Sequence, residues 1–204
     1  MNIHSVAPKR PDLDRLLIDS ALALFAERTY EGTQMPAVAQ HAGVGVGSIY
    51  RYFPSKEALG NAAFRYAKRT LLDTLAEALA DGGPAGTARE EFARFWRGFT
   101  RYASAHPDAF VFLEHQQHDT FLDPESRALA DELHRVAADF IERGQHAGAI
   151  RDGDAEQLVG LALGAFTGLV KLARPAGGLD ALPAEDLDRA EAAVWDLLHR
   201  KADR

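Results

Sequence analysis

Residues Gly43–Phe53 read GVGVGSIYRYF and combine three alternating glycines with three aromatic rings within four positions. Glycine-rich turns hold a nucleotide phosphate when they follow a strand, with the spacing G-x-G-x-x-G or G-x-x-x-x-G-K-[ST]. Here the spacing is G-x-G-x-G, the preceding AVAQHA has a helical pattern, and Ile49 and Tyr50 follow the glycines in place of Lys-Ser. Both spacing and context therefore argue against a phosphate-binding enzyme loop.

The same stretch fits a turn followed by a short helix. A helix ends at Ala42, Gly43 turns the chain in the left-handed conformation, and a second helix begins near Gly45. This is the spacing of a helix-turn-helix motif. Ile49 faces the core, and the N-terminal residues of such a second helix reach base edges in the major groove. The opposite face presents Val46, Gly47, Ser48, Tyr50 and Arg51.

A second group with possible chemistry is His115 and His118 with Glu114 and Asp119. Histidine is the commonest general acid–base, so an all-α enzyme using these residues is an alternative hypothesis. The sequence offers no complete catalytic arrangement. No outer-shell partner supports a metal site at the two histidines and Asp119, and we expect neither a metal nor a cofactor. The residues otherwise line a cavity or lie on the surface.

The composition indicates a soluble globular protein. The 204 residues are 47% hydrophobic and 26% charged and include no cysteine, which excludes disulfides and thiolate zinc sites. We expect no apolar run near the roughly 18 residues that span a bilayer. The first fifteen residues lack the apolar core of a signal peptide. We therefore expect a cytoplasmic protein with no membrane partner.

The net charge of −7 is divided unevenly along the chain. Residues 1–56 hold six Lys/Arg and five Asp/Glu, a net +1, whereas the remainder holds 17 Lys/Arg and 25 Asp/Glu, a net −8. The acidity belongs to the C-terminal three-quarters, so the N-terminal part can approach a polyanion without strong repulsion.

Nearly every segment has helical spacing of apolar residues, which predicts an all-α fold of about nine helices. Thr33 is expected to cap the second helix and Ser55 the fourth, and residues 174–183 are expected to form a loop. The expected helices span about 12–28, 33–42, 45–53, 55–80, 87–105, 107–119, 124–144, 152–173 and 184–199.

The N-terminal quarter strongly resembles the TetR family of transcriptional regulators. The resemblance covers about residues 12–59, and the joint spacing of its motifs is highly specific. The helix ending in LALFAER and the following YEGTQM also fit. The rest of the chain matches the family in architecture and length. The matching positions are Thr33, Val38, Ala39, Ala42, Gly43, Val44, Gly47, Ser48, Ile49, Tyr50, Tyr52, Phe53, Lys56, Glu57, Ala58 and Leu59.

The resemblance implies a DNA-binding domain over residues 1–56, with roles by position. Val46, Gly47 and Ser48 would face the bases. Arg51 would either contact DNA or remain a solvated charge, and Lys9 and Arg10 would form a basic arm or a tail. Gly45 and Val46 depart from the family, which usually has a polar cap and a polar or basic residue there. Phosphates would be contacted by Thr33, Tyr50, Tyr52 and Lys56, although packing is the alternative for the two tyrosines.

The resemblance further implies a ligand-binding and dimerisation domain over residues 57–204. Two helices, about 154–173 and 184–199, would pair with those of a second copy. Gly160, Gly164 and Gly168 lie four apart on one face of the first, which favours close helix packing. An aromatic stripe at positions 92–99 is either core or part of a ligand site. The candidate pocket residues are Phe95, Trp96, Phe99, Phe112, His115, Gln116, Asp119 and Phe166.

The function expected from these features is that of a homodimeric repressor. It would bind a double-stranded DNA operator and be released by a small, largely apolar effector. Besides the enzyme, the other alternative is an interaction adaptor whose helix-turn-helix contacts proteins. Binding to an operator distinguishes the three hypotheses.

Overall fold

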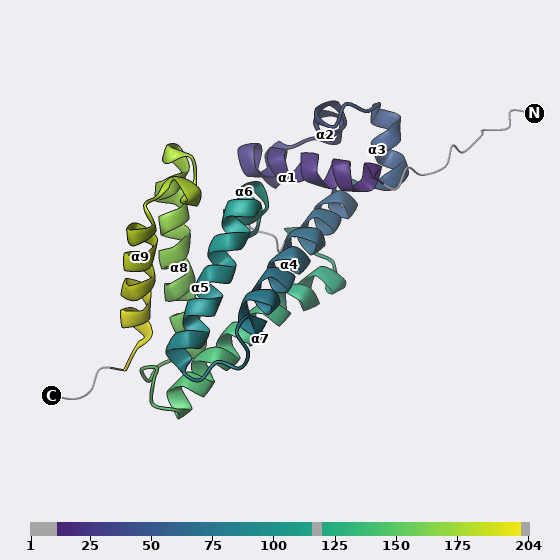
Figure 1. The fold of residues 1–204 in the computed structure, drawn as a ribbon. Coiled ribbons are helices and arrows are strands. Elements are labelled where there is room, and N and C mark those ends of the chain that lie inside the picture. Colours follow the sequence, from purple (N-terminus) through teal and green to yellow (C-terminus); the bar gives the residue numbers. More distant parts are fainter. Residues whose placement is uncertain (1–11, 116–119, 201–204) are drawn as a thin grey trace, which may run out of the picture.

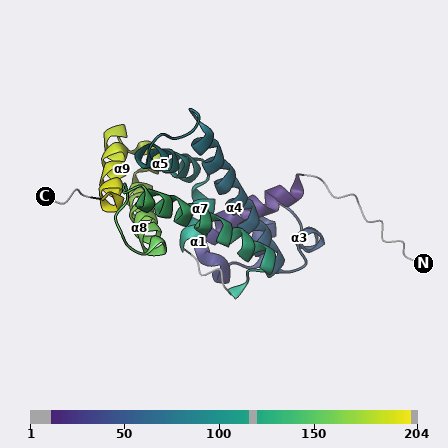
Figure 2. The same ribbon diagram turned by 90° about the horizontal axis from the view of Figure 1, so that it is seen from below.

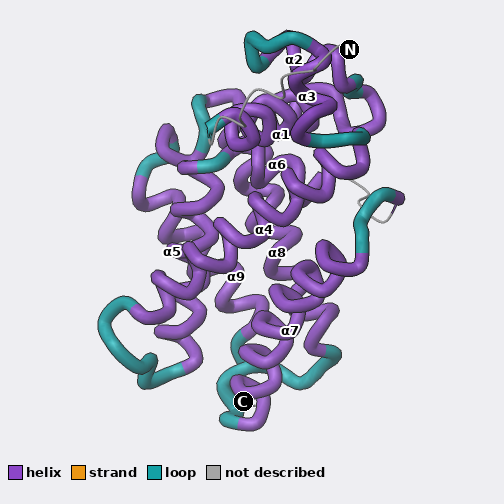
Figure 3. The backbone as a smooth tube through the Cα atoms, turned by 90° about the vertical axis from the view of Figure 1, so that its right-hand side faces the viewer, coloured by secondary structure: helices purple, strands orange, loops and turns teal. Residues whose placement is uncertain are grey.

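The computed structural model describes residues 12–115 and 120–200, and over these ranges the chain forms nine α-helices (Figure 1). The all-α prediction is confirmed, and the tube in Figure 3 contains no strand over the described residues. An isolated antiparallel bridge joins Ile150 and His199. The helices are α1 (Leu13–Gly32), α2 (Met35–His41), α3 (Val46–Tyr52), α4 (Lys56–Ala80), α5 (Ala88–Ala105), α6 (Pro107–His115), α7 (Pro124–His146), α8 (Ala155–Ala173) and α9 (Ala184–Leu198).

The end of α1 differs from the prediction. The backbone kinks at Thr29, which has a φ of 68°, and the helical assignment then continues to Gly32. Thr33 closes α1 instead of capping α2: its hydroxyl donates to the carbonyl oxygens of Thr29 at 2.8 Å and Leu24 at 3.3 Å. The predicted cap is therefore wrong, because the kink turns Thr33 inward. The N-cap of α2 is Gln34, without a side-chain hydrogen bond.

The turn between α2 and α3 forms as predicted. Gly43 has a φ of 68°, its N–H donates to the Gln40 carbonyl at 3.1 Å, and the Val44 N–H donates to the Ala39 carbonyl at 2.9 Å. These two bonds are those of a Schellman motif, in which a left-handed residue satisfies the last carbonyls of a helix. Gly45 is the N-cap of α3. The two short helices are thus fixed in the helix-turn-helix arrangement.

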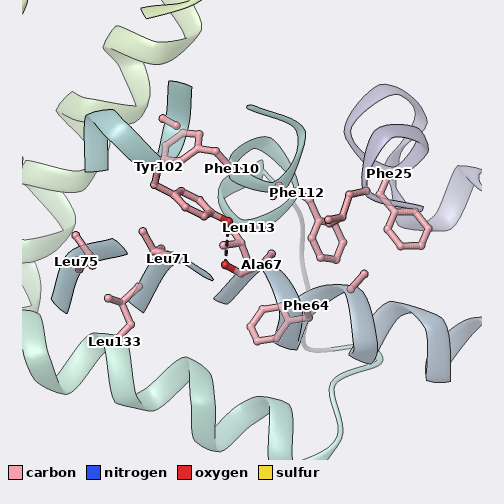
Figure 4. Close-up of a cluster of buried hydrophobic side chains, with 14 of the residues drawn as sticks. Phe25, Phe64, Ala67, Leu71, Leu75, Tyr102, Phe110, Phe112, Leu113 and Leu133 are labelled. Carbon is pink, nitrogen blue, oxygen red and sulfur yellow. Dashed lines mark hydrogen bonds between the residues drawn. The ribbon is translucent and has the colours of Figure 1, made fainter. Parts of the chain in front are cut away.

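The long helix α4 joins the N-terminal helices to the rest of the molecule (Figure 1). Ser55 caps it as predicted by accepting a hydrogen bond from the Ala58 N–H at 3.2 Å. Helix α4 packs against α1, α5, α6 and α7. At its centre the buried Tyr102 hydroxyl donates to the Ala67 carbonyl at 2.9 Å, within the apolar cluster drawn in Figure 4. Helix α4 is therefore packed on several sides and runs from the N-terminal helices into the C-terminal part.

The last two long helices lie side by side at one edge, on the opposite side of the molecule from α3 (Figures 1 and 2). Asp154 caps α8 through the Gln157 N–H at 2.9 Å. The loop expected between α8 and α9 contains two short 3-10 turns, Arg174–Ala176 and Leu179–Ala181. The helix-turn-helix and the edge formed by α8 and α9 therefore lie far apart in the molecule.

Candidate DNA-binding surface and effector cavity

One face of α3 is open to solvent. Val46 is 44% exposed and Tyr50 is 47% exposed, and Gly47 and Arg51 beside them are also exposed. A Cβ placed on Gly47 would meet no atom within 4 Å. Ile49, on the opposite face, is fully buried. The helix therefore presents a low, mostly uncharged ridge that a groove of DNA can cover.

The remaining predicted contact residues lie around this ridge. Ser48 and Tyr52 are half-buried. The Lys56 ammonium donates to the Glu31 carbonyl at 3.1 Å and lies 4.4 Å from the centre of the Tyr30 ring. The positive charge is thus held at the junction of α1 and α4, next to the end of α3.

Thr33 lies apart from the ridge. Its side chain is 2% exposed, and its hydroxyl is engaged by carbonyls of α1 as described above. In this conformation the Thr33 hydroxyl is therefore buried and bonded to carbonyls of α1. The predicted basic arm, Lys9 and Arg10, lies outside the described residues.

The C-terminal part contains a cavity of about 480 Å³ between α4, α5, α7 and α8. Four of the predicted pocket residues line it: Phe95, Trp96, Phe99 and Phe166. The Trp96 and Phe166 rings meet edge to face with centroids 5.1 Å apart. The volume lies in the range of about 300–1,000 Å³ typical of small-molecule sites. The aromatic stripe of α5 thus forms both core and cavity wall.

Phe112 was also predicted to line the pocket, and the structure places it elsewhere. Its ring is fully buried and stacks on Phe25 of α1. The next residues of α6, Leu113 and Glu114, line the cavity. The prediction fails because Phe112 points from α6 toward α1, away from the cavity. The side chains of His115, Gln116 and Asp119, and that of His118, lie outside the described part of the structure.

The prediction missed a charged residue in the cavity wall. Lys68 of α4 is 7% exposed, and burial lowers the pKa of its ammonium, an effect that the nearby Glu114 carboxylate partly offsets. Glu114 accepts a hydrogen bond from the Thr167 hydroxyl of α8 at 3.4 Å. A signal was present in the sequence: Lys68 follows Phe64 by four residues, on an apolar face that continues through Leu71 and Leu75.

Aromatic contacts connect the cavity wall to the DNA-binding helices. Phe112 of α6 stacks on Phe25 with centroids 5.3 Å apart (Figure 4). Phe121 stacks on Tyr30 at 4.0 Å, and burial, with smaller contributions from Glu57 and Glu31, raises the pKa of Tyr30 to about 12. Leu113 and Leu122, the immediate neighbours of Phe112 and Phe121, line the cavity. The cavity wall is therefore one residue away from side chains that contact α1.

Buried hydrogen bonds fix the same junction. The Asn61 amide of α4 donates to the Phe121 carbonyl at 2.8 Å, and its oxygen accepts from the Asp123 N–H at 2.8 Å. The Asp123 carboxylate caps α7 through the Ser126 N–H and pairs with Arg65 at 2.8 Å. These contacts lower the pKa of Asp123, chiefly through the Ser126 N–H. The segment leading into α7 is thus held against α4.

The outer face of α8 is apolar and exposed. Leu161 is 56% exposed and Leu172 is 76% exposed, and a Cβ on Gly160, Gly164 or Gly168 would meet no atom within 4 Å. By length and hydropathy alone, residues Ala155–Ala176 could cross a membrane. This corrects the expectation that no apolar stretch reaches that length. The segment is this apolar because its charged residues are few and lie near its ends.

The open recognition helix, the cavity and the separate apolar edge define a helix-turn-helix regulator with a second, ligand-sized site. The chain matches the family of bacterial regulatory proteins called the tetR family over residues 17–63. It also matches the tetracyclin repressor-like C-terminal domain over residues 69–199. The chain belongs to the TetR family of DNA-binding transcriptional regulators, which is not an enzyme family. The enzyme hypothesis is thereby set aside.

Two curated relatives and one solved structure illustrate the similarity. The HTH-type transcriptional repressor KstR of Mycolicibacterium smegmatis is 45% identical over 69 residues, which cover 33% of this chain and 34% of the relative. The fatty acid metabolism regulator protein of Bacillus subtilis is 27% identical over 71% of this chain and 74% of its own length. A TetR family transcription regulator structure from Marinobacter aquaeolei VT8 has a TM-score of 0.79 at 19% identity, covering 93% and 97% of the two chains. The chain spans about a third of the length of KstR.

Proposed function

We propose that the protein is a homodimeric repressor that leaves its operator when a small, largely apolar molecule fills the cavity. The observation that carries this proposal is a pair of aromatic contacts between the surroundings of the two sites. Residues adjacent to the cavity wall, Phe112 and Phe121, stack on Phe25 and Tyr30 of the helix that supports α2 and α3. Relatives of the chain are named as repressors, which supports the direction of regulation.

The proposed DNA contacts divide into base and phosphate contacts. The residues that face the bases are Val46, Gly47 and Ser48. The phosphates are contacted by Tyr50, Tyr52 and Lys56. Arg51 lies at the edge of this surface. The open face of α3 supports the first set, because small side chains allow the backbone to approach the base edges. Thr33 leaves the proposed set, since its hydroxyl is bonded inside the domain. The DNA-binding domain is proposed to end near residue 56, where α4 begins.

The proposed dimer interface is the exposed face of α8 together with α9. Leu161 and Leu172 are large, apolar and exposed, and the glycines between them allow a second helix to approach closely. Ala192 and Ala193 extend the small-residue surface onto α9. A two-fold pairing here places two copies of α3 on one DNA duplex, and such motifs read half-sites about 34–36 Å apart. Burial in this interface accounts for the apolar α8 without a membrane, and we place the protein in the cytoplasm with its DNA.

The proposed release follows from unequal affinity of the effector for two conformations. A ligand shifts an equilibrium only by the difference between its affinities for the two states. Filling the cavity displaces α6 and the segment before α7, and the displaced rings move α1 and α4. The two recognition helices then no longer fit successive grooves.

The test is an electrophoretic mobility shift with genomic fragments selected by the purified protein. We expect a sequence-selective complex that weakens steeply with salt, because phosphate contacts release counterions. Light scattering of the same sample should give the mass of a dimer. If no fragment is retained above the level of random DNA at any salt concentration, the proposed function is wrong.

A further inference from the structure

The Lys68 side chain of α4 is buried in the wall of the largely apolar cavity. The residue is 7% exposed and lines the cavity, and among the described residues no hydrogen bond or ion pair engages its nitrogen. The nitrogen lies 5.8 Å from the centre of the Phe64 ring. Buried ammonium groups are costly unless they are paired. A cavity that binds only apolar molecules would gain nothing from a buried ammonium group in its wall.

The rest of the wall defines the shape of the missing partner. Phe95, Trp96, Phe99 and Phe166 form an apolar wall contributed by α5 and α8. The Glu114 carboxylate also lines the cavity and keeps a hydrogen bond from Thr167. Lys68 is the only ammonium in the described lining, which otherwise carries the Glu114 carboxylate and the His134 imidazole, and one ammonium pairs with one anionic group. A single negative charge at the end of an apolar body matches this arrangement.

We propose that the effector is an amphipathic monocarboxylate whose carboxylate pairs with the Lys68 ammonium while its apolar body lies against the aromatic wall. The proposal rests on the proposed function and specifies the chemistry of its ligand. Pairing removes the cost of the buried charge, so binding favours the ligand-filled conformation. The preference of the cavity for a carboxylate over an uncharged head is then set by one residue.

The test compares decanoate with decan-1-ol, which share an apolar chain and differ in head group, at concentrations below micelle formation. Calorimetric titration of the full-length protein without DNA should show decanoate binding at least tenfold more tightly, equivalent to about 1.4 kcal/mol. Lys68→Met should remove this preference and leave decan-1-ol binding within about threefold of wild type. Arg69→Met, which removes a neighbouring exposed charge on α4, should leave the preference intact.

Equal affinity for the two probes, or a preference that survives in Lys68→Met, would overturn the proposal. Binding of neither probe would also overturn it, since both fit the stated chemistry. Circular dichroism of Lys68→Met verifies that the variant is folded. A protein that binds decanoate through Lys68 but never binds DNA would refute the proposed function alone. Release of DNA by decan-1-ol and not by decanoate would refute the proposed carboxylate head group and leave the proposed function intact.

Discussion

The rings of Phe25 in α1 and Phe112 in α6 stack with centroids 5.3 Å apart and planes inclined by 28°. Both rings are almost completely buried. This pair joins a helix of the DNA-binding domain to a helix that lines the cavity, so an effector need not act through solvent or a flexible linker. In the proposed mechanism, the coupling between the two sites depends on how rigidly such pairs are packed.

Phe112→Leu should weaken this connection. We expect a stability loss of about 1–2 kcal/mol, from the lost aromatic pair and the smaller side chain. The effector concentration that releases half of the DNA should rise. Chemical denaturation and mobility shifts measure the two effects. Ile150→Val, a buried change outside the cavity wall with a similar cost of about 0.5–1.5 kcal/mol, is the control. Identical release curves for the two variants would refute the role of Phe112.

Asn61→Asp should destabilise the protein, although the two side chains are nearly equal in size. The variant retains an acceptor for the Asp123 N–H but replaces the amide that donates to the Phe121 carbonyl with an oxygen. Leaving that buried carbonyl unsatisfied costs about 1–3 kcal/mol, and a buried carboxylate adds to it. Urea denaturation should show the loss at pH 7 and partial recovery at acid pH, as the new carboxyl becomes protonated. A pH-independent stability equal to wild type would contradict this account.

Lys68→Met should stabilise the protein at neutral pH by about 1 kcal/mol or more, because a buried charge is exchanged for an apolar chain. Burial lowers the folded-state pKa of Lys68, so the folded protein releases this proton at lower pH than the unfolded chain. Wild-type stability therefore gains from Lys68 as pH rises through the folded pKa toward the unfolded value of about 10.4. The advantage of the variant should shrink over that window. Urea denaturation at pH 7 and pH 10 tests this sign, and an advantage that grows with pH would contradict it.

Lys56→Met and Val46→Ala should affect DNA binding in different ways. Loss of the Lys56 charge should weaken binding to all sequences and reduce the slope of log affinity against log salt by about 0.9. Val46→Ala should leave the slope unchanged and alter discrimination between operators, because an apolar side chain can contact a thymine methyl group. Salt titrations on two operators separate the effects. A slope unchanged by Lys56→Met would remove that residue from the phosphate contacts.

Gly164→Arg should disrupt the proposed dimer without unfolding the monomer. A Cβ at this position meets nothing within 4 Å, so a large side chain is accommodated in a single chain. Placed between two closely packed α8 helices, the same side chain would separate them. Light scattering should report a monomer for this variant and a dimer for Ala76→Arg, an exposed position on α4. A dimer of unchanged affinity in Gly164→Arg would exclude this face of α8.

Local signals made much of the fold predictable from the sequence. Gly43 ends a helix and Ser55 begins one through hydrogen bonds to neighbours within five residues, so spacing alone identifies both. The described helices appear near their expected positions for the same reason. The cap predicted at Thr33 is wrong because its hydroxyl reaches Leu24, nine residues earlier. This contact depends on the kink at Thr29, which the sequence pattern does not predict.

The cavity was less predictable because its walls come from distant segments. Phe112 and Phe166 are equally apolar, yet Phe112 contacts α1 whereas Phe166 lines the cavity. Which of them faces the cavity depends on how α6 is rotated against α1, and helical periodicity does not fix that rotation. Lys68 was missed for the related reason that its burial results from α6 and α7 folding over α4.

The length of α4 determines how far a small rotation of this helix moves its far end. Its 25 residues make a rod about 37 Å long at about 1.5 Å per residue. With one end fixed, a rotation of about 5° moves the other end by about 3 Å, close to the rise of about 3.4 Å between successive bases in a DNA strand. In the proposed dimer, two such rods would double the change in spacing between the recognition helices. A conformational change too small to disturb the core can therefore shift the protein out of register with its operator.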